Sequence, residues 1–497
     1  MSEHAILQGA EAAICRPWLR HVLPREDWTA LARNAVADGW TLLAHWADTH
    51  AAHAMYFDPA ALAVVPVSVP VEHGRYPALS PVHPGAARYE RMVHDLWGHQ
   101  AELGADPRPW LDHGKWPLAA PLSIRPQHAP EHDPPEPADA PSDPLTLLPL
   151  GPLWGDRQEA AQLRLLVDGR FIRQAESRLG YTHKGTLALM RGKSPRAAAR
   201  FAARLSGDAT VAHGLAFALA TEAAADVQVP PRATALRVVM AEIERIAGHL
   251  DNLAEVAALA GVQTIRTRCG GLRESLVRAA ATAFGHRLMM DSVIPGGVAA
   301  DLTHEGTESI LRVLGEISTQ LPWLRQAHDG AALFVHLSGI GRASGALAAT
   351  LGVGGVVGRA CGLGFDVRTV FVPGYAALSP RVAVRPNGDA AARQQLRLFE
   401  IEESVRLIGG ALQSLPDGPT SLPLPQVSGE GIGCAESIRG DVWHWLQLDH
   451  GQIAAIFPRD PGWYLWPLAE RVLENGTVDD AALIRLSFGL PSSGPDL

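Results

Sequence analysis

Cysteine and long apolar runs are both scarce in this sequence. Its 497 residues include four cysteines, and no two of them lie close enough to form a CxxC pair; they are Cys15, Cys269, Cys361 and Cys434. This spacing excludes a continuous zinc or iron–sulfur ligand motif and is typical of reduced thiols rather than of a disulfide scaffold. The longest uncharged run, residues 343–358, is rich in glycine and shorter than the ~20 apolar residues of a membrane span. We therefore expect that the chain does not itself cross a membrane.

Positive charge is not in excess either. The chain has 43 Lys and Arg residues against 52 Asp and Glu residues, a net charge of −9, so it lacks the domain-wide basic surface that predicts nucleic-acid binding. The first 20 residues do not show the basic-then-apolar pattern of a secretory signal. Hydrophobic residues make up 47% of the chain and charged residues 19%, which is the composition of a globular protein with a large core.

Proline is concentrated in one segment. Residues 125–149 read RPQHAPEHDPPEPADAPSDPLTLLP. Because proline fixes φ and removes a backbone donor, an extended, semi-rigid linker is expected here. We therefore predict a first domain over residues 1–125, a linker over 126–149 and a second domain over 150–497. Few contacts should cross the linker, and the two domains should fold independently.

The first domain carries the signals of an α+β fold. Apolar residues recur at helical spacing through residues 27–46, and the β-branched residues of 62–71 predict a strand. Pro66 and Pro70 interrupt that strand, which favours a position at the edge of a sheet.

The second domain is predicted to be mainly helical. It opens on a hairpin signal, Asp168-Gly169 between two strand-like runs, and it closes on strand-like runs at 441–448 and 453–457. Between them, apolar residues recur at helical spacing in the segments 194–205, 213–225, 232–260, 272–282, 305–320 and 391–415. The predicted fold class is α+β: a small N-terminal α+β domain plus a large, mainly helical bundle domain with β elements at both ends.

Several segments, taken in order, carry a resemblance to a known family. The NiFe-hydrogenase large subunit and the related quinone-site (49 kDa-type) subunit of respiratory complex I contain segments similar to LRLLVDGRFI (163–172), LGYTHKG (179–185), AEIERIAGHL (241–250), FGHRLMMDSVIPGGV (284–298), GRACGLGFDVR (358–368) and RGDVWHWLQLD (439–449). The N-terminal part resembles the 30 kDa-type partner subunit of complex I through YERMVHDLWG (89–98) and DPRPWLDHGKWP (106–117). The order is that of fused, membrane-bound hydrogenases of the formate hydrogenlyase type, and the resemblance spans nearly the whole chain.

The resemblance implies a metal site whose ligands this sequence does not contain. A NiFe site needs four soft thiolates, which the family supplies as two CxxC pairs; the corresponding positions here are Ser206, Ala209, Pro491 and Gly494. The acidic residue that the resemblance implies after the HKG motif is replaced by Leu187. We therefore expect no metal in this chain, and we do not expect it to be an active NiFe hydrogenase by itself.

The quinone ligands that the resemblance implies are also missing. A histidine after the opening Gly-Pro and a tyrosine in the first helical region are expected, and this sequence has Trp154 and Gly207 there. An aromatic ring such as that of Trp154 could still stack on a quinone. The GVGG segment at 352–355 lacks the rest of a dinucleotide motif, so NAD binding is expected of a whole complex rather than of this chain.

The residues that persist at matching positions are candidates for the wall of a remnant cavity: Trp154, His183, Ser206, His213, Glu222, Arg359, Asp366, Arg368 and Asp460. Structural roles compete with functional ones at these positions. Arginine–carboxylate pairs usually brace loops, a buried carboxylate on an apolar helix such as Glu222 needs a partner, for which an arginine is expected, and a lone histidine is more often a packing residue than a catalyst. Asp460, which precedes a proline, is typical of a turn or cap residue.

The resemblance implies a core subunit in the peripheral arm of a complex-I-like or hydrogenase-related membrane oxidoreductase complex that couples electron transfer to ion translocation. It implies no cofactor held by this chain, a quinone as the small molecule for the cavity, and Fe-S clusters in partner subunits. The implied partners are a small iron–sulfur subunit, a ferredoxin-like subunit and antiporter-like membrane subunits, at the cytoplasmic face of the inner membrane. The alternatives are a redox-inactive scaffold or assembly subunit and, third, a NiFe enzyme with unusual ligands.

Overall fold

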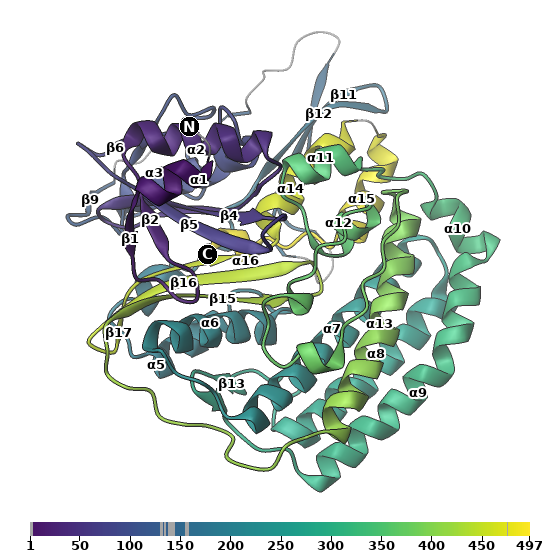
Figure 1. Cartoon of the computed structure of the whole chain (residues 1–497). Coiled ribbons are helices and arrows are strands. Elements are labelled where there is room, and N and C mark those ends of the chain that lie inside the picture. Colours follow the sequence, from purple (N-terminus) through teal and green to yellow (C-terminus); the bar gives the residue numbers. More distant parts are fainter. Residues whose placement is uncertain (1–2, 130–132, 134–135, 138–144, 155–158, 475) are drawn as a thin grey trace.

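The computed structural model describes residues 3–129, 133, 136–137, 145–154, 159–474 and 476–497. Its N-terminal part is a five-stranded sheet in the order β1-β2-β5-β4-β3 with helices packed against it (Figure 1). The elements of this part are α1 (Glu3–Gly9), β1 (Glu11–Ala13), β2 (Arg20–Val22), α2 (Arg25–Ala37), β3 (Thr41–Ala47), β4 (Ala51–Asp58), β5 (Ala63–Pro70), β6 (Arg75–Pro77), α3 (Ala87–Trp97) and β7 (Gln100–Glu102). The α+β character expected for this part is confirmed.

Two details of the N-terminal sheet differ from expectation. The predicted helix over 27–46 divides into α2 and β3, because the chain turns at Gly39, whose φ of 74° lies in the left-handed region that glycine adopts without strain. The strand β5 is not at an edge, since it pairs with β4 on one side and β2 on the other. Because β2 lies opposite only Val67 and Ser68, both prolines fall outside the stretch that is paired on both sides.

Parts of the expected linker, residues 126–149, form short strands. Residues Gln127–His128 form β9, which pairs with β8 (Leu118–Ala119), and Thr146–Leu150 form β10. The predicted hairpin around Asp168-Gly169 is confirmed as β11 (Gln162–Asp168) and β12 (Phe171–Arg178), and β10 joins it as a third antiparallel strand. Apart from residues 133, 136 and 137, the stretch 130–144 lies outside the described residues.

The predicted helices are all present, some of them longer than expected: α5 (Pro195–Ala202), α6 (Thr210–Ala225), α7 (Pro231–Leu259), α8 (Gln263–Phe284), α9 (His304–Asp329) and α13 (Ala390–Gln413). Shorter helices are α4 (Thr186–Met190), α10 (Ala331–Leu337), α11 (Gly345–Thr350), α12 (Gly355–Ala360), α14 (Gly462–Leu473), α15 (Ala481–Phe488) and α16 (Ser493–Asp496). The helices α7, α8, α9 and α13 pack as the expected bundle (Figure 1). Among the described residues, no helix combines the length and hydropathy that crossing a bilayer requires.

The C-terminal sheet, β15 (Gly429–Glu436), β16 (Asp441–Asp449) and β17 (Gln452–Arg459), lies against α6. The strand β15 was not expected from the sequence. A Cβ atom on Gly431 would lie 2.1 Å from the Ala220 carbonyl oxygen, and one on Gly433 would lie 2.3 Å from the Ala220 nitrogen. Only glycine therefore permits the close approach of β15 to α6.

The two parts of the chain share one continuous hydrophobic core, so the expectation that few contacts cross between them is wrong. Trp46 on β3 lies against Trp445 and Phe457 of the C-terminal sheet, with ring centroids 5.4 and 5.5 Å apart. Tyr89 on α3 stacks on Trp463 of α14 at 4.4 Å. A small domain buries too little surface alone to cover such rings, and here they are covered where the two parts meet.

We expect Trp46→Ala to lower the free energy of unfolding of the whole chain by about 3–5 kcal/mol, because it opens a cavity inside the shared core. Thermal unfolding followed by circular dichroism should show a single transition that moves to lower temperature. The control is Trp323→Ala on α9, where the ring is partly exposed and the shift should be smaller. Two separate transitions, with only one of them displaced by Trp46→Ala, would contradict the shared core.

Candidate functional site

A buried network of arginines and carboxylates lies where α7, α12, α13 and β15 meet. It comprises Glu242 and Arg245 from α7, Arg359 from α12, Asp366 and Arg368 from the following loop, Glu400 from α13 and Glu436 from β15, each at most 4% exposed. Nη1 of Arg359 lies 3.0 Å from both Asp366 Oδ2 and Glu436 Oε1. Arg368 contacts Asp366, Glu242 and Glu400 at 2.7 to 3.2 Å. Arg359, Asp366 and Arg368 thus brace a loop, as the structural alternative predicts.

The carboxylates of this network differ in protonation. Burial alone would raise the pKa of Glu400, but Arg359, Arg368 and Arg245 hold it well below its ordinary range. Burial and the neighbouring Asp366 instead raise the pKa of Glu436 to about 8. At neutral pH the protonated Glu436 leaves three carboxylates against three guanidiniums, and this balance reduces the cost of burying the network.

We expect Glu436→Gln and Glu400→Gln to respond differently to pH. The pKa of Glu436 is higher in the folded chain than in the unfolded one, so its stabilising effect is present at low pH and is lost as pH rises through about 8. Glu436→Gln should therefore unfold near the wild-type temperature at about pH 4, below the ordinary pKa of a glutamate, and at a higher temperature at about pH 9. Glu400→Gln should be less stable than wild type at both values, by about 3–5 kcal/mol, because three guanidiniums lose their shared partner.

Thermal unfolding of the three proteins at the two pH values is the measurement. A Glu436→Gln variant that is less stable than wild type at the higher pH would contradict the raised pKa. A Glu400→Gln variant that is more stable than wild type at the higher pH would contradict the assignment of an ionised Glu400 beside a protonated Glu436.

His213 on α6 lies in a second buried cluster. Its Nδ1 is 3.1 Å from Nε2 of His444 on β16, and its Nε2 is 3.1 Å from Oδ2 of Asp460. Burial lowers the pKa of His444 well below its ordinary range, so the His444 ring is neutral. Asp460 also accepts the N–H of Gly462 at 2.7 Å at the start of α14, which confirms it as a turn residue. The cluster joins α6 to the sheet and to the turn before α14.

His183 holds the end of the chain. Its Nδ1 lies 2.5 Å from the carbonyl oxygen of Asp496, and its ring stacks on Trp116 with centroids 4.7 Å apart. The Asp496 carboxylate accepts the N–H groups of Gly180 and Thr182 at 2.7 and 2.8 Å. The LGYTHKG motif is therefore the place to which the C-terminal segment is anchored.

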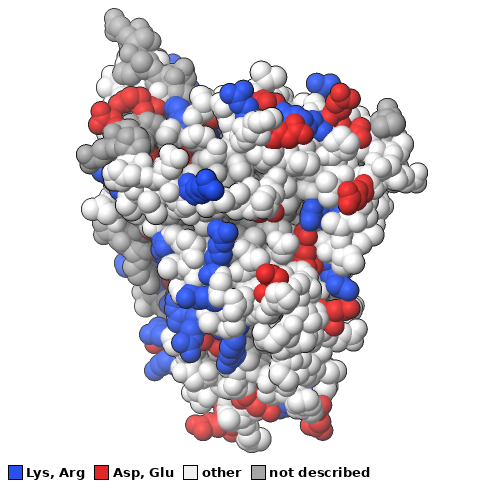
Figure 2. Space-filling model, turned by 90° about the vertical axis from the view of Figure 1, so that its left-hand side faces the viewer, with Lys and Arg blue, Asp and Glu red and all other residues white. Residues whose placement is uncertain are grey.

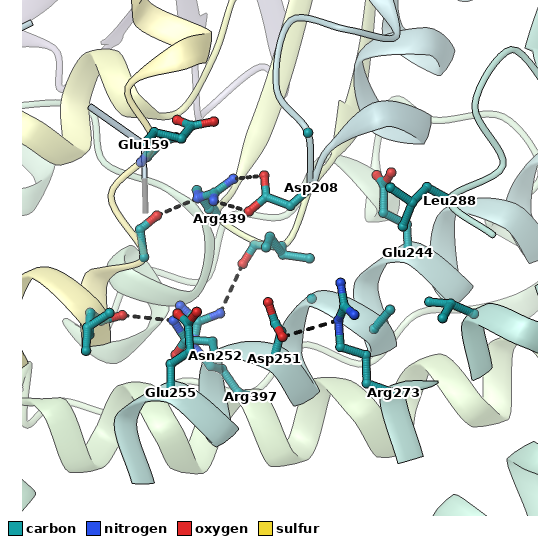
Figure 3. Close-up of a pocket in the computed structure, with 18 of the residues that line it drawn as sticks. Glu159, Asp208, Glu244, Asp251, Asn252, Glu255, Arg273, Leu288, Arg397 and Arg439 are labelled. Carbon is teal, nitrogen blue, oxygen red and sulfur yellow. Dashed lines mark hydrogen bonds and ion pairs between the residues drawn. The ribbon is translucent and has the colours of Figure 1, made fainter. Parts of the chain in front are cut away.

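A cavity of about 300 Å³ opens between α7, α8 and α15 (Figure 3). Its wall includes residues 207–208, which lie between the first two positions where the resemblance places metal ligands, and residues 489–491, which include the third, Pro491. Nη1 of Arg439 lies 2.6 Å from Oδ1 of Asp208, and the Ser206 hydroxyl donates to the same oxygen at 3.0 Å. Arg439 also donates to the Gly489 carbonyl, so one guanidinium bridges the two segments.

Glu244 and Trp154 are two further residues near this cavity. Burial raises the pKa of Glu244, in the cavity wall, to about 8, even though its carboxylate accepts the N–H groups of Val211 and Ala212 at the start of α6. One face of the Trp154 ring is covered by the Arg485 guanidinium, which lies 3.8 Å from the ring centroid. Glu244 is therefore neutral at neutral pH, and Trp154 serves as a platform for an arginine.

The residues of the two segments do not fit a NiFe centre. None of Ser206, Ala209, Pro491 and Gly494 offers a thiolate, and the cysteines of the chain are buried and free. A Cβ atom on Gly494 would lie 2.2 Å from Cγ of Asp460, so this position has no room for any side chain. Within the described part of the chain, no group of three or more His, Cys, Asp or Glu side chains is arranged to hold a metal ion. We derive no metal chemistry from this site.

We expect Gly494→Ala to destabilise the chain by about 1–3 kcal/mol, because the added methyl group must displace the Asp460 carboxylate from its partners. Gly207→Ala is the matched control in the opposite segment. A Cβ atom there meets nothing within 4 Å, and its effect should stay within about 0.5 kcal/mol. Chemical denaturation of both variants is the measurement, and equal stability of the two would contradict the packing at Gly494.

Of the nine candidates from the sequence, Glu222 alone lies in the wall of either described cavity. It borders a second, mainly apolar cavity of about 430 Å³. There it pairs with Arg237, Oε1 to Nη2 2.5 Å, and accepts the Gly296 N–H, so the expected pairing with an arginine is confirmed. The others lie in the clusters described above and outside both cavity walls: Trp154, His183, Ser206, His213, Arg359, Asp366, Arg368 and Asp460. The structure places these residues in separate buried clusters, and their role as the wall of one remnant cavity stays a prediction.

Sequence reasoning did not single out several charged residues that form the network and the cavity. They are Asp208, Glu242, Glu244, Arg245, Arg397, Glu400 and Arg439. The signal that could have found two of them, Glu242 and Arg245, is helical spacing of charge. Glu242, Arg245 and His249 recur on α7 at the i, i+3, i+7 spacing of one helix face, and all are buried. Charged residues repeated along the apolar face of a helix indicate a buried network.

Two family models match this chain. Residues 260–428 match the model of the 49 kDa subunit of respiratory-chain NADH dehydrogenase. Residues 184–265 match the model of nickel-dependent hydrogenases. The likeness of the N-terminal part to the 30 kDa-type partner subunit, which lies outside these ranges, stays a prediction, as do the boundaries of the domains.

Curated relatives come from both branches. The chain is 27% identical to the carbon monoxide-induced hydrogenase of Rhodospirillum rubrum over 68% of its own length and 95% of that protein. It is 28% identical to formate hydrogenlyase subunit 5 of Escherichia coli, over 84% of its length and 76% of that protein. It is 30% identical to a chloroplastic NAD(P)H-quinone oxidoreductase subunit of Panax ginseng, over 57% of its own length and 72% of that protein.

A solved structure shows the same fold. A chain of the membrane-bound sulfane sulfur reductase, described as an archaeal respiratory membrane complex, matches with a TM-score of 0.67 and 22% identity. The match covers 72% of this chain and 100% of that one. At this identity the likeness is one of fold alone.

Proposed function

The chain belongs to the family of the complex I 49 kDa subunit and the NiFe-hydrogenase large subunit, and we propose that it is a core subunit in the peripheral arm of a complex-I-like or hydrogenase-related membrane oxidoreductase complex. In this proposal it carries no NiFe centre. Electron transfer uses Fe-S clusters of partner subunits, and antiporter-like membrane subunits move the coupled ion.

The Asp208–Arg439 pair is the observation that supports the absence of a metal centre most strongly. It lies beside the segment that would have to supply one pair of thiolates, and Arg439 reaches the other segment through the Gly489 carbonyl. A fixed guanidinium repels a metal cation, and a carboxylate already paired with it is a poor replacement for a soft ligand. This chain therefore contributes packing surface and a buried charge network rather than a redox centre.

A basic surface supports docking of an acidic partner. Residues 177–207 contain seven Lys and Arg residues and no Asp or Glu, within a chain whose net charge is −9. Figure 2 shows Lys and Arg side chains gathered low on the face of the molecule where α5 lies. Arg196 and Arg200 are exposed and form no ion pair with a described residue. We assign this surface, residues 191–204, to the small iron–sulfur subunit, with the ferredoxin-like subunit beyond it.

The test is to purify the native complex through a tag on this chain, identify its subunits and measure bound nickel and electron-transfer activity. We expect a small iron–sulfur subunit and antiporter-like membrane subunits in stoichiometric amounts, with no nickel. The double variant Arg196→Glu/Arg200→Glu should weaken retention of the iron–sulfur subunit by about tenfold or more, and the loss should be larger at low salt.

The matched control is Arg278→Glu/Arg312→Glu, which changes two exposed arginines on α8 and α9. It should leave the complex intact. Stoichiometric nickel on this chain would overturn the proposal. An active complex that lacks the chain altogether would instead identify it as the scaffold or assembly protein of the alternative.

A further inference from the structure

Arg397 on α13 is a buried guanidinium without an ion-pair partner among the described residues. Its side chain is 1% exposed and lines the cavity of Figure 3. Its contacts are with His249 Nδ1 at 3.2 Å and with the carbonyl oxygens of Ile438 and Ser487 at 3.4 Å, and its Nε has no acceptor. Burial and the nearby Arg439 and Arg393 lower its pKa to about 9. A buried charge left in this state is costly unless an anion joins it.

Nitrogen atoms converge in front of Arg397, at the turn that follows α15. A Cβ atom on Gly489 would lie 3.3 Å from Nη2 of Arg397, 3.5 Å from Nδ2 of Asn252 and 3.9 Å from Nε of Arg439. Gly489 has a φ of 69° and carries no side chain to fill this space. The Arg439 Nε–H is already donated to the Gly489 carbonyl, and one N–H of the Asn252 amide to the Leu486 carbonyl at 2.8 Å. The donors that remain at this point are the Arg397 guanidinium edge and the second N–H of Asn252, an arrangement that a planar carboxylate recognises.

The acidic residues in the wall do not supply the missing charge. Asp208 is paired with Arg439, and Asp251 with Arg273 at 3.3 Å. The Glu159 carboxylate accepts the N–H groups of Ser492 and Ser493 at 2.7 and 2.8 Å. Glu244, whose pKa burial raises to about 8, is neutral at neutral pH, and Glu255 has an interaction of its own.

The wall also carries apolar side chains, among them Ile243, Leu288, Ile438 and Leu490, next to further arginines such as Arg287 and Arg485. A cavity of about 300 Å³ in which the buried Arg397 guanidinium lies near apolar side chains suits a small molecule with a short hydrocarbon body. We propose that this cavity is a binding site for a small organic monocarboxylate, with the carboxylate on Arg397 and the hydrocarbon part against Leu288 and Leu490. This site goes beyond the proposed subunit role and does not depend on it.

The test measures the melting temperature of the full chain against rising acetate, butyrate or inorganic phosphate, with ionic strength held constant by chloride. Saturation-transfer NMR, in which saturation passes from the protein to bound butyrate and is observed on the butyrate methyl signal, measures binding directly. We expect stabilisation in the order butyrate, then acetate, then phosphate, together with saturation transfer. Arg397→Lys should bind butyrate about tenfold more weakly, because a point charge replaces the two-pronged donor.

Arg397→Met should abolish the butyrate response and should fold at least as well as wild type, because it removes an unpaired buried charge. The matched control is Arg393→Lys, one turn earlier on α13 and outside the cavity wall, which should keep the response. Leu288→Trp, which fills the cavity from the opposite wall, should lose it. The proposal fails if butyrate stabilises Arg397→Met as much as wild type or if phosphate stabilises wild type as well as butyrate does. It also fails if wild type transfers no saturation to butyrate.

Discussion

Glu400 touches three arginines that come from three different elements: Arg245 from α7, Arg359 from α12 and Arg368 from the loop after α12. A carboxylate and three guanidiniums can be buried together only if every charge finds its partners, since an uncompensated buried charge costs several kcal/mol. A slip of α13 by one turn would move Glu400 by about 5.4 Å and leave all three arginines without it. The helix register, the position of the loop and the place of β15 therefore all depend on this one set of contacts.

The same constraint distinguishes two arginines in the cavity wall. Arg439 has a carboxylate partner in Asp208 and a carbonyl acceptor in Gly489, so it holds two chain segments together. Arg397 faces the same space from α13 and has only long contacts with a histidine nitrogen and two carbonyl oxygens. Arg393, one turn earlier on α13, also lacks an ion pair among the described residues, but it donates to two carbonyl oxygens and to the Ser487 hydroxyl at 2.8 to 2.9 Å. The contacts of Arg397 are longer, which points to a partner from outside the chain.

Features set by a few neighbouring residues could be predicted from the sequence, whereas features set by contacts between distant residues could not. Helical spacing located α7 and α13, and Asp168-Gly169 located the hairpin, because those patterns are set within a few residues. The strand β15 was not predicted because glycine is unfavourable inside a strand. The reason for Gly431 and Gly433 is their close contact with the backbone of α6, which the sequence alone does not show. The shared core was not predicted for a similar reason. Trp46 and Trp445 are far apart in the sequence, and the proline-rich segment between them suggested two separate domains, whereas the fold brings the two rings together. The role of Asp208 also requires a long-range contact, with Arg439.

At the positions to which the resemblance assigns metal ligands, other contacts fill the space. The position of Gly494 is closed by Asp460, which is itself held by His213 and the Gly462 N–H. The Pro491 carbonyl accepts the indole N–H of Trp466 at 2.5 Å, which fixes the backbone of that segment. Gly494 and Pro491 are thus built into neighbouring packing and hydrogen-bonding clusters. Returning cysteines to the four positions would therefore displace Asp460 before any thiolate could reach a metal, because the contacts that now occupy that space also stabilise the fold.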